Sequence, residues 1–184
     1  MNRVIAVPTE TEAREMRAVY GQSLAELART DERIVVLDAD LMRANGTVVF
    51  KDEFPERAID VGVAEANMVG IAAGLASTGL IPFPATFTCF ASRRVFDQFF
   101  ISANYARLGV KLTGTDPGVA ALLNGGTHMS FEDMGLMRSI PGLTIYEPAD
   151  PVSLKALLRQ LRAVQRARDL SAQNVVNGPV LRPD

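Results

Sequence analysis

The sequence predicts an α/β fold, a three-layer sandwich in which helices cover both faces of a mostly parallel sheet. Strand-like apolar runs alternate with segments of helical periodicity along the chain. The run RIVVLDAD (33–40) is apolar until its acidic end, which is typical of a parallel strand buried on both faces. With 184 residues, the chain can bury a core without a disulfide or metal.

The helices follow from spacing and end signals. Residues 11–29 place Met16, Val19, Tyr20 and Leu24 near one face. Gly79 ends the second predicted helix and Pro151 begins the last one. The predicted helices are 11–29, 64–79, 92–108, 131–140 and 151–170.

Apolar runs between these helices predict the strands, and a loop with three glycines spans 117–130. Ligands bind such sheets beyond the carboxyl ends of the strands, where Asp40, Glu65, Phe87 and Asp116 are expected to lie. The predicted strands are 33–40, 57–63, 80–88, 109–116 and 143–150.

We expect a main domain over residues 1–165, followed by a tail or last edge strand over 166–184. Within that segment, GPVLR (178–182) reads equally well as an edge strand or as a frayed end.

Composition excludes several classes of protein. Hydrophobic residues make up 48% and charged residues 22%, so the chain is globular rather than disordered. A net charge of −2 gives no basic field for nucleic acid. The single cysteine, Cys89, permits no intramolecular disulfide, and a cytoplasmic location is the default expectation. Glycines and prolines break the apolar run 68–87, so it predicts a helix, turn and strand rather than a membrane span.

Glu65 is the only formally charged residue between Val63 and Leu75. A first-turn glutamate commonly complements the helix dipole. A carboxylate in apolar surroundings must instead be paired or kept for a ligand, because burying it alone is costly. Composition leaves both interpretations open.

A family resemblance bears on this choice. The stretch VGVAEANMVGIAAGLASTGLIPFPATF (61–87) resembles the pyrimidine-binding domain of the transketolase family of thiamine diphosphate enzymes. RIVVLDADL, TFTCFASRR and GGTHMSFEDMGLMRSIPGLTIYEPAD follow in the family's order and spacing. The resemblance covers roughly residues 13–160, and an ordered set of motifs is a stronger signal than one glutamate.

The resemblance implies a cofactor site. A glutamate in the slot of Glu65 hydrogen-bonds a ring nitrogen of the cofactor's aminopyrimidine and so activates the cofactor. Phe87 and Phe90 match the aromatic wall around that ring, although core packing is the commoner fate of a phenylalanine. Asp40 matches an aspartate at the cofactor–substrate boundary, with a turn role as its alternative. Arg93 occupies a family position that is often tyrosine.

The resemblance also implies a sugar site, with departures. Arg17 matches an arginine that holds the sugar phosphate, and His128 a histidine that touches the sugar. Asp116 stands where the familiar enzymes have a further histidine, and Asn124 where they have an aspartate. Ala44 replaces a serine that helps to hold phosphate. We therefore expect a ketose other than the ordinary pentose phosphate, with another acidic group or none.

The pyrophosphate-binding domain of a whole transketolase has no counterpart in this sequence. The resemblance is thus to the second chain of a split enzyme without its C-terminal domain. A partner subunit would hold Mg²⁺ and the diphosphate, thiamine diphosphate would be shared, and the chain would form a homo- or hetero-oligomer. The implied activity is ketol transfer between sugars, and Glu65 and His128 are its candidate catalytic residues.

Two hypotheses remain open at this point. The chain is a catalytic half, inactive without its partner, or a non-catalytic pyrimidine-domain module that acts in assembly only. Deoxyxylulose-phosphate synthases and 2-oxoacid dehydrogenase β subunits share this domain, but GVAEANM and GGTH are closer to transketolase-like chains.

Overall fold

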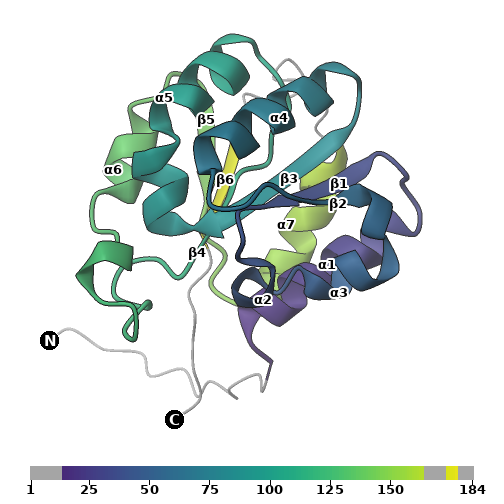
Figure 1. The fold of residues 1–184 in the computed structure, drawn as a ribbon, viewed down its shortest axis with the longest axis horizontal. Helices are drawn as coiled ribbons and strands as arrows, with labels where there is room; N and C mark the ends of the chain where they lie inside the picture. Colours follow the sequence, from purple (N-terminus) through teal and green to yellow (C-terminus); the bar gives the residue numbers. More distant parts are fainter. Residues whose placement is uncertain (1–13, 164–172, 178–184) are drawn as a thin grey trace, which may run out of the picture.

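The computed structural model describes residues 14–163 and 173–177 (Figure 1). Their strands form one parallel sheet in the order β2-β1-β3-β4-β6-β5. All strand carboxyl ends therefore meet at one edge. The strands are β1 (Ile34–Asp38), β2 (Ala58–Asp60), β3 (Ile81–Phe87), β4 (Thr113–Thr115), β5 (Leu143–Tyr146) and β6 (Gln173–Asn177).

Helices lie on both sides of the sheet, which confirms the predicted three-layer sandwich (Figure 1). The α-helices are α1 (Met16–Ala28), α2 (Met42–Asn45), α3 (Val48–Glu53), α4 (Glu65–Ser77), α5 (Phe96–Gln98), α6 (Asp133–Arg138) and α7 (Pro151–Ala163). The 3-10 turns are η1 (Pro55–Arg57) and η4 (Gly126–His128), and the π-helical segments are η2 (Phe90–Arg94) and η3 (Phe99–Tyr105).

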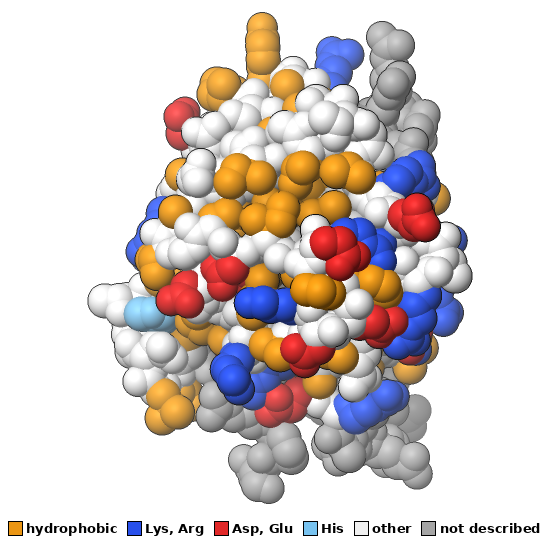
Figure 2. Space-filling view, turned by 45° about the vertical axis from the view of Figure 1, so that its right-hand side comes forward, with side chains coloured by type: hydrophobic (Ala, Val, Ile, Leu, Met, Phe, Trp, Pro, Cys, Tyr) orange, Lys and Arg blue, Asp and Glu red, His pale blue; other side chains and the backbone are white. Residues whose placement is uncertain are grey.

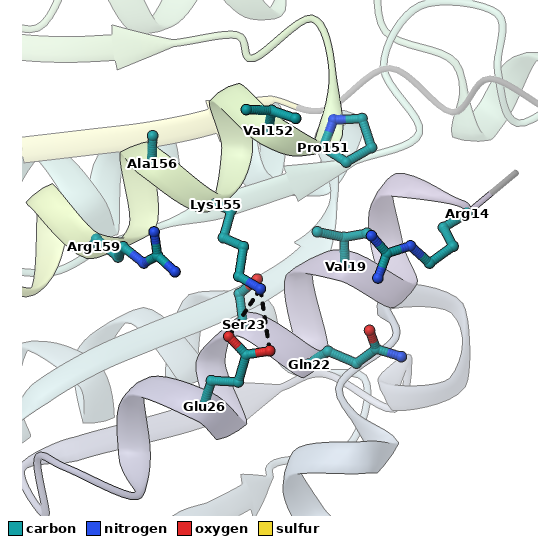
Figure 3. Close-up of a pocket in the computed structure, with 10 residues that line it drawn as sticks. All are labelled: Arg14, Val19, Gln22, Ser23, Glu26, Pro151, Val152, Lys155, Ala156 and Arg159. Atoms are coloured by element: carbon teal, nitrogen blue, oxygen red, sulfur yellow. Dashed lines mark hydrogen bonds and ion pairs between the residues drawn. The ribbon is translucent and has the colours of Figure 1, made fainter. Parts of the chain in front are cut away.

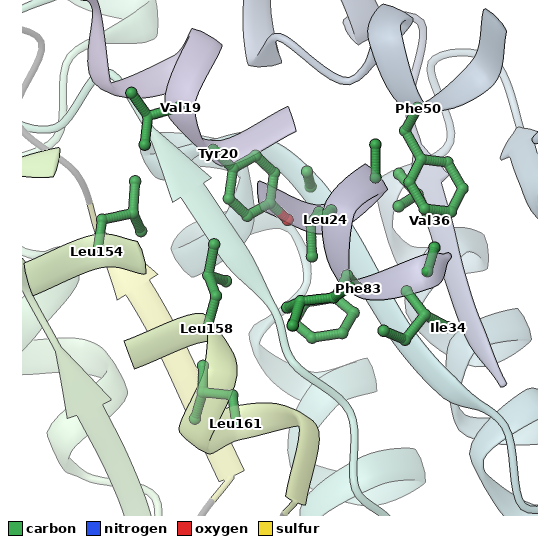
Figure 4. Packing of buried hydrophobic residues seen from close by; sticks show 14 of the residues in the cluster. Val19, Tyr20, Leu24, Ile34, Val36, Phe50, Phe83, Leu154, Leu158 and Leu161 are labelled. Atoms are coloured by element: carbon green, nitrogen blue, oxygen red, sulfur yellow. The ribbon is translucent and has the colours of Figure 1, made fainter. Parts of the chain in front are cut away.

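Strand β1 supplies both halves of the core because its side chains alternate between the two faces. Ile34 and Val36 face α1, α3 and α7, where Leu24, Phe83 and Leu158 fill the interior (Figure 4). On the other face, the β1 side chains Val35 and Leu37 pack with α4, η3 and α6. That half of the core includes Met68, Val69, Ala72, Phe99 and Met137.

Three segments differ from the sequence predictions. The predicted helix 92–108 is divided into η2, α5 and η3, and two short helices, α2 and α3, occupy a region without an assigned element. The strand near the C-terminus is at 173–177 and lies between β4 and β5 rather than at the sheet edge. Residues 178–182, suggested as an edge strand, lie outside the described residues.

Helix α4 buries one face only. Its residues Met68, Val69, Ala72 and Ala73 pack on the sheet, while Gly74 is exposed. Figure 2 shows hydrophobic side chains gathered on the surface at the height of α4 and the β1–β2 edge of the sheet. The sequence of this helix is apolar on almost every side, which predicts burial in a core or at an interface with another domain, and the interface stays a prediction. Within the described part of the chain, no helix is long and apolar enough to cross a bilayer.

Candidate active site

A cavity of about 530 Å³ opens at the carboxyl ends of β1, β3 and β4. Its position is the usual ligand site of a parallel sheet, and its volume suits a small organic ligand. Eight of the nine residues singled out from the sequence line it, and Arg93 does not. The lining residues are Arg17, Ala39, Asp40, Leu41, Ala44, Val63, Glu65, Phe87, Phe90, Arg94, Asp116, Ala121, Asn124 and His128.

Glu65 begins α4 and is only 2% exposed. Its Oε1 accepts a hydrogen bond from Arg94 Nη1 at 2.6 Å. The carboxylate is therefore paired rather than left alone in an apolar wall. Glu65 lies in the first turn of α4, where the helix dipole favours a negative charge. It also lines the cavity, so its position agrees with both interpretations drawn from the sequence, the helix-dipole role and the ligand role.

Two phenylalanines form an aromatic wall where β3 ends. The rings of Phe87 and Phe90 have centroids 6.2 Å apart and are tilted by 35°. The imidazole of His128 packs edge-on against both rings, at 5.9 Å and 5.2 Å. The Gly-rich loop 117–130 thus places His128 against the aromatic rings at the end of β3.

This loop is fastened on its outer side by Arg93. The Arg93 guanidinium donates a hydrogen bond to the carbonyl oxygen of Met129 at 3.2 Å and forms an ion pair with Glu132 at 3.1 Å. At the base of the loop, the Ser130 N–H donates to the carbonyl of Gly118. In this structure, Arg93 positions the loop that carries His128.

Arg94 is a cavity residue that sequence reasoning missed. Its guanidinium carbon lies 3.9 Å from the centroid of the Phe90 ring, in addition to its bond with Glu65. Phe90 and Arg94 are four positions apart in the π-helical segment η2. Side chains four positions apart on a helix lie on nearly the same face, so Arg94 comes to lie beside Phe90.

Two aspartates at strand ends have positive φ angles. Asp40 follows β1 with φ 63°, and Asp116 follows β4 with φ 52°. Asparagine and aspartate are the residues most often found in this left-handed region after glycine, and such conformations cluster at functional sites. The Asp40 N–H donates to Asp60 Oδ1, which holds the turn.

A buried aspartate, Asp38, organises the loop behind Asp40. It accepts hydrogen bonds from the N–H of Leu41, Asn45 Nδ2 and Thr47 Oγ1 at 2.7, 2.9 and 3.0 Å. Burial raises the pKa of Asp38 to about 6, against the opposing effect of these bonds. Asn45 in turn accepts a bond from Thr115 Oγ1, which ties the ends of β1 and β4 together. In the sequence, Asp38 is simply part of the predicted strand, so its role was missed.

Charge at the other end of the cavity centres on Arg17. Its Nε lies 2.6 Å from Glu15 Oε2. The hydrogen bond with Glu15, with the nearby charges of Glu15 and Asp116, raises the pKa of Arg17. Asn124 and Ala44 also line the cavity. One guanidinium is therefore faced by two carboxylates, so these three groups together carry a net negative charge.

A second, smaller cavity of about 200 Å³ lies between α1 and α7 (Figure 3). Lys155 crosses it to pair with Glu26 at 3.0 Å. It lies away from the aromatic wall and shares no lining residue with the larger cavity. In the described part of the chain, no three side chains of His, Cys, Asp or Glu form a group able to hold a metal ion.

Comparison with known proteins identifies the family. The family model described as the transketolase pyrimidine-binding domain matches residues 12–171. The chain belongs to this family. The solved "Split gene transketolase, inactive beta4 tetramer" superposes on this transketolase pyrimidine domain with a TM-score of 0.76 and 35% identity, covering 92% of this chain and 53% of that one.

Two curated relatives extend the comparison. The 6-deoxy-6-sulfo-D-fructose transketolase subunit SqwH of Clostridium sp. (strain MSTE9) is 57% identical over 148 residues, which are 80% of this chain and 46% of that protein. Human transketolase is 38% identical over 74% of this chain and 22% of its own length. This transketolase pyrimidine domain thus spans less than half the length of either relative.

Proposed function

We propose that this chain is the pyrimidine-binding subunit of a split, thiamine diphosphate-dependent transketolase that acts on a sulfonated ketose. The observation that carries the proposal is the convergence of Glu65, Phe87, Phe90 and His128 on one cavity. A buried carboxylate beside two aromatic faces suits a flat heteroaromatic ring with a polar edge. These residues therefore fit the cofactor that the family implies.

Each residue has a distinct role in this proposal. Glu65 would hold a ring nitrogen of the aminopyrimidine, and the two phenylalanines would contact the ring. When bound, the cofactor supplies the carbanion chemistry of ketol transfer. His128 would contact sugar hydroxyls, and Asp40 would lie at the boundary between cofactor and sugar. Mg²⁺ and the diphosphate would be held by a partner subunit that carries the pyrophosphate-binding domain.

The sugar is proposed from two findings together. SqwH is named for 6-deoxy-6-sulfo-D-fructose. Arg17 and Asp116 line the cavity and Glu15 pairs with Arg17, so a sulfonate with one negative charge is repelled less there than a phosphate dianion. Removing two carbons from this six-carbon ketose would leave a four-carbon aldose that keeps the sulfonate. The prediction of a cytoplasmic, oligomeric enzyme stays a prediction.

The test is to co-purify the chain with its pyrophosphate-binding partner from its own cells, then supply thiamine diphosphate and Mg²⁺. Turnover of 6-deoxy-6-sulfo-D-fructose in preference to fructose 6-phosphate would support the proposal. Preference for fructose 6-phosphate or xylulose 5-phosphate would contradict the sulfonate assignment. A stable complex with bound partner but no ketol transfer would favour the non-catalytic module instead.

A further inference from the structure

Arg94 makes two contacts inside the cavity at once. Its Nη1 lies 2.6 Å from Glu65 Oε1, and its guanidinium carbon lies 3.9 Å from the centre of the Phe90 ring. The first contact uses the carboxylate that would hold a cofactor ring nitrogen. The second covers a face of the aromatic wall. Both are the contacts that the proposed function gives to an aminopyrimidine.

A guanidinium and an aminopyrimidine are alike in shape and in the contacts that they make. Both are flat, both carry nitrogen hydrogen-bonding groups in the plane, and both stack on aromatic faces. They are unlike in one respect. The guanidinium donates hydrogen bonds to an ionised carboxylate, whereas the ring nitrogen must accept a hydrogen bond from a protonated Glu65. The same Oε1 and the same face of Phe90 cannot serve both groups together.

Arg94 has room to move out of the way. Its side chain is 45% exposed. On its outer side lies an open hollow of about 500 Å³, lined by Val63, Ala64, Ala66 and Asn67 together with Glu65 and Arg94. Glu65 and Arg94 thus lie between this hollow and the main cavity.

We propose that Arg94 occupies the pyrimidine subsite of the chain when it lacks cofactor, and that it must release Glu65 before an aminopyrimidine binds. This inference rests on the proposed function. Arg94 is then a residue that sets cofactor affinity, because the observed dissociation constant increases as the fraction of chains with an open subsite decreases. It keeps Glu65 paired until the cofactor arrives.

The test uses the full-length isolated chain and the neutral probe 4-amino-5-hydroxymethyl-2-methylpyrimidine, with binding measured by calorimetry. Arg94→Ala is expected to tighten binding about tenfold. Arg57→Ala is a matched control, because Arg57 also stacks on a phenylalanine, Phe54, at 4.1 Å but does not line the cavity. The control should bind the probe like the wild type. Equal or weaker binding by Arg94→Ala would overturn the inference.

A second measurement needs no substitution. The probe carries no charge, so added salt acts on the protein alone. It screens the ion pair between Glu65 and the half-exposed Arg94. Wild-type affinity is expected to rise several-fold between low and high NaCl, and an unchanged affinity would contradict the inference. Failure of the proposed function is distinguishable, since a partner complex that binds no thiamine diphosphate would refute that function whatever Arg94 does.

Discussion

The backbones of Gly21 and Gly46 touch. A Cβ added to Gly21 would lie 1.9 Å from the carbonyl oxygen of Gly46, and a Cβ on Gly46 would lie 2.1 Å from that of Arg17. Gly46 also has φ 77°, a conformation that favours glycine. Helix α1 and the end of α2 are therefore in contact without intervening side chains, next to the cavity residues Arg17 and Ala44.

Gly21→Ala is expected to lower the free energy of unfolding by about 1–3 kcal/mol, because backbone must move to admit a methyl group. Urea unfolding of the isolated chain measures this. Gly74→Ala is the control: a Cβ added at Gly74 would have no atom within 4 Å, and α4 should gain about 0.5–1 kcal/mol. An unchanged free energy of unfolding of the Gly21→Ala variant would show that α2 can shift away from the added methyl group at little energetic cost.

Glu65→Gln is expected to reduce ketol transfer by the partner complex about 10²- to 10⁴-fold, because an amide cannot share a proton with a ring nitrogen as a carboxyl does. Single-turnover assays measure the loss, and size-exclusion chromatography with light scattering follows assembly. Assembly should be unaffected. Full activity in the variant would remove Glu65 from its proposed role.

Glu15→Gln should shift sugar preference toward phosphate. Removing the carboxylate that lies 2.6 Å from Arg17 reduces the electrostatic repulsion of a phosphate dianion more than that of a sulfonate monoanion. The ratio of kcat/KM for fructose 6-phosphate to kcat/KM for the sulfonated ketose should therefore rise about five- to tenfold. Glu26→Gln, which breaks the pair with Lys155 outside the main cavity, serves as the control. Equal ratios in both variants would exclude Glu15 from substrate selection.

Asp38 makes stability depend on pH. Its pKa of about 6 in the folded chain exceeds the ordinary value, so folding favours the protonated form. The free energy of unfolding should therefore fall as pH rises from about 4 to about 6, by roughly 1–3 kcal/mol from this group. Asp38→Asn should remove that slope while losing hydrogen-bond acceptors for Asn45 and Thr47. Identical slopes in both proteins would contradict the assignment.

Lys111 should make the free energy of unfolding depend on pH in the neutral to alkaline range. It is 1% exposed, its Nζ donates to the Gly109 carbonyl at 2.6 Å, and burial lowers its pKa to about 8. Folding thus disfavours the charged lysine, a cost that is full below about pH 8 and disappears as pH rises toward 10. Lys111→Met should stabilise the chain at pH 7 by about 1–3 kcal/mol. Guanidinium unfolding at pH 7 and 10 checks this, and a destabilised variant at pH 7 would refute it.

The sequence identifies most of the cavity because motif spacing fixes where strands end. Glu65 and Phe87 lie at predicted strand ends, Phe90 and His128 are implied by the family resemblance, and the structure brings all four to one cavity. Alternating apolar runs were likewise enough for the sandwich, since each strand must bury two faces.

The missed features depend on geometry that spacing does not encode. The family resemblance draws attention to Arg93, whereas Arg94, one residue later, is the one of these two arginines that lines the cavity. Asp38 occupies the last position of an apolar run, and its role appears only once Asn45 and Thr47 fold back onto it. The strand at 173–177 has a weak apolar pattern, and its place is set by pairing with β4 and β5.

The position of β6 also dictates an order of assembly. In the described sheet, β5 pairs with β6 and has no ladder with β4, so β5 joins the rest of the sheet through a strand made later. During synthesis, residues 143–146 cannot join the sheet until residues 173–177 have left the ribosome. The first strands of the sheet can pair well before that moment. We expect the half that bears Glu65 and Phe87 to become ordered before the β5–α7 half is fixed in place.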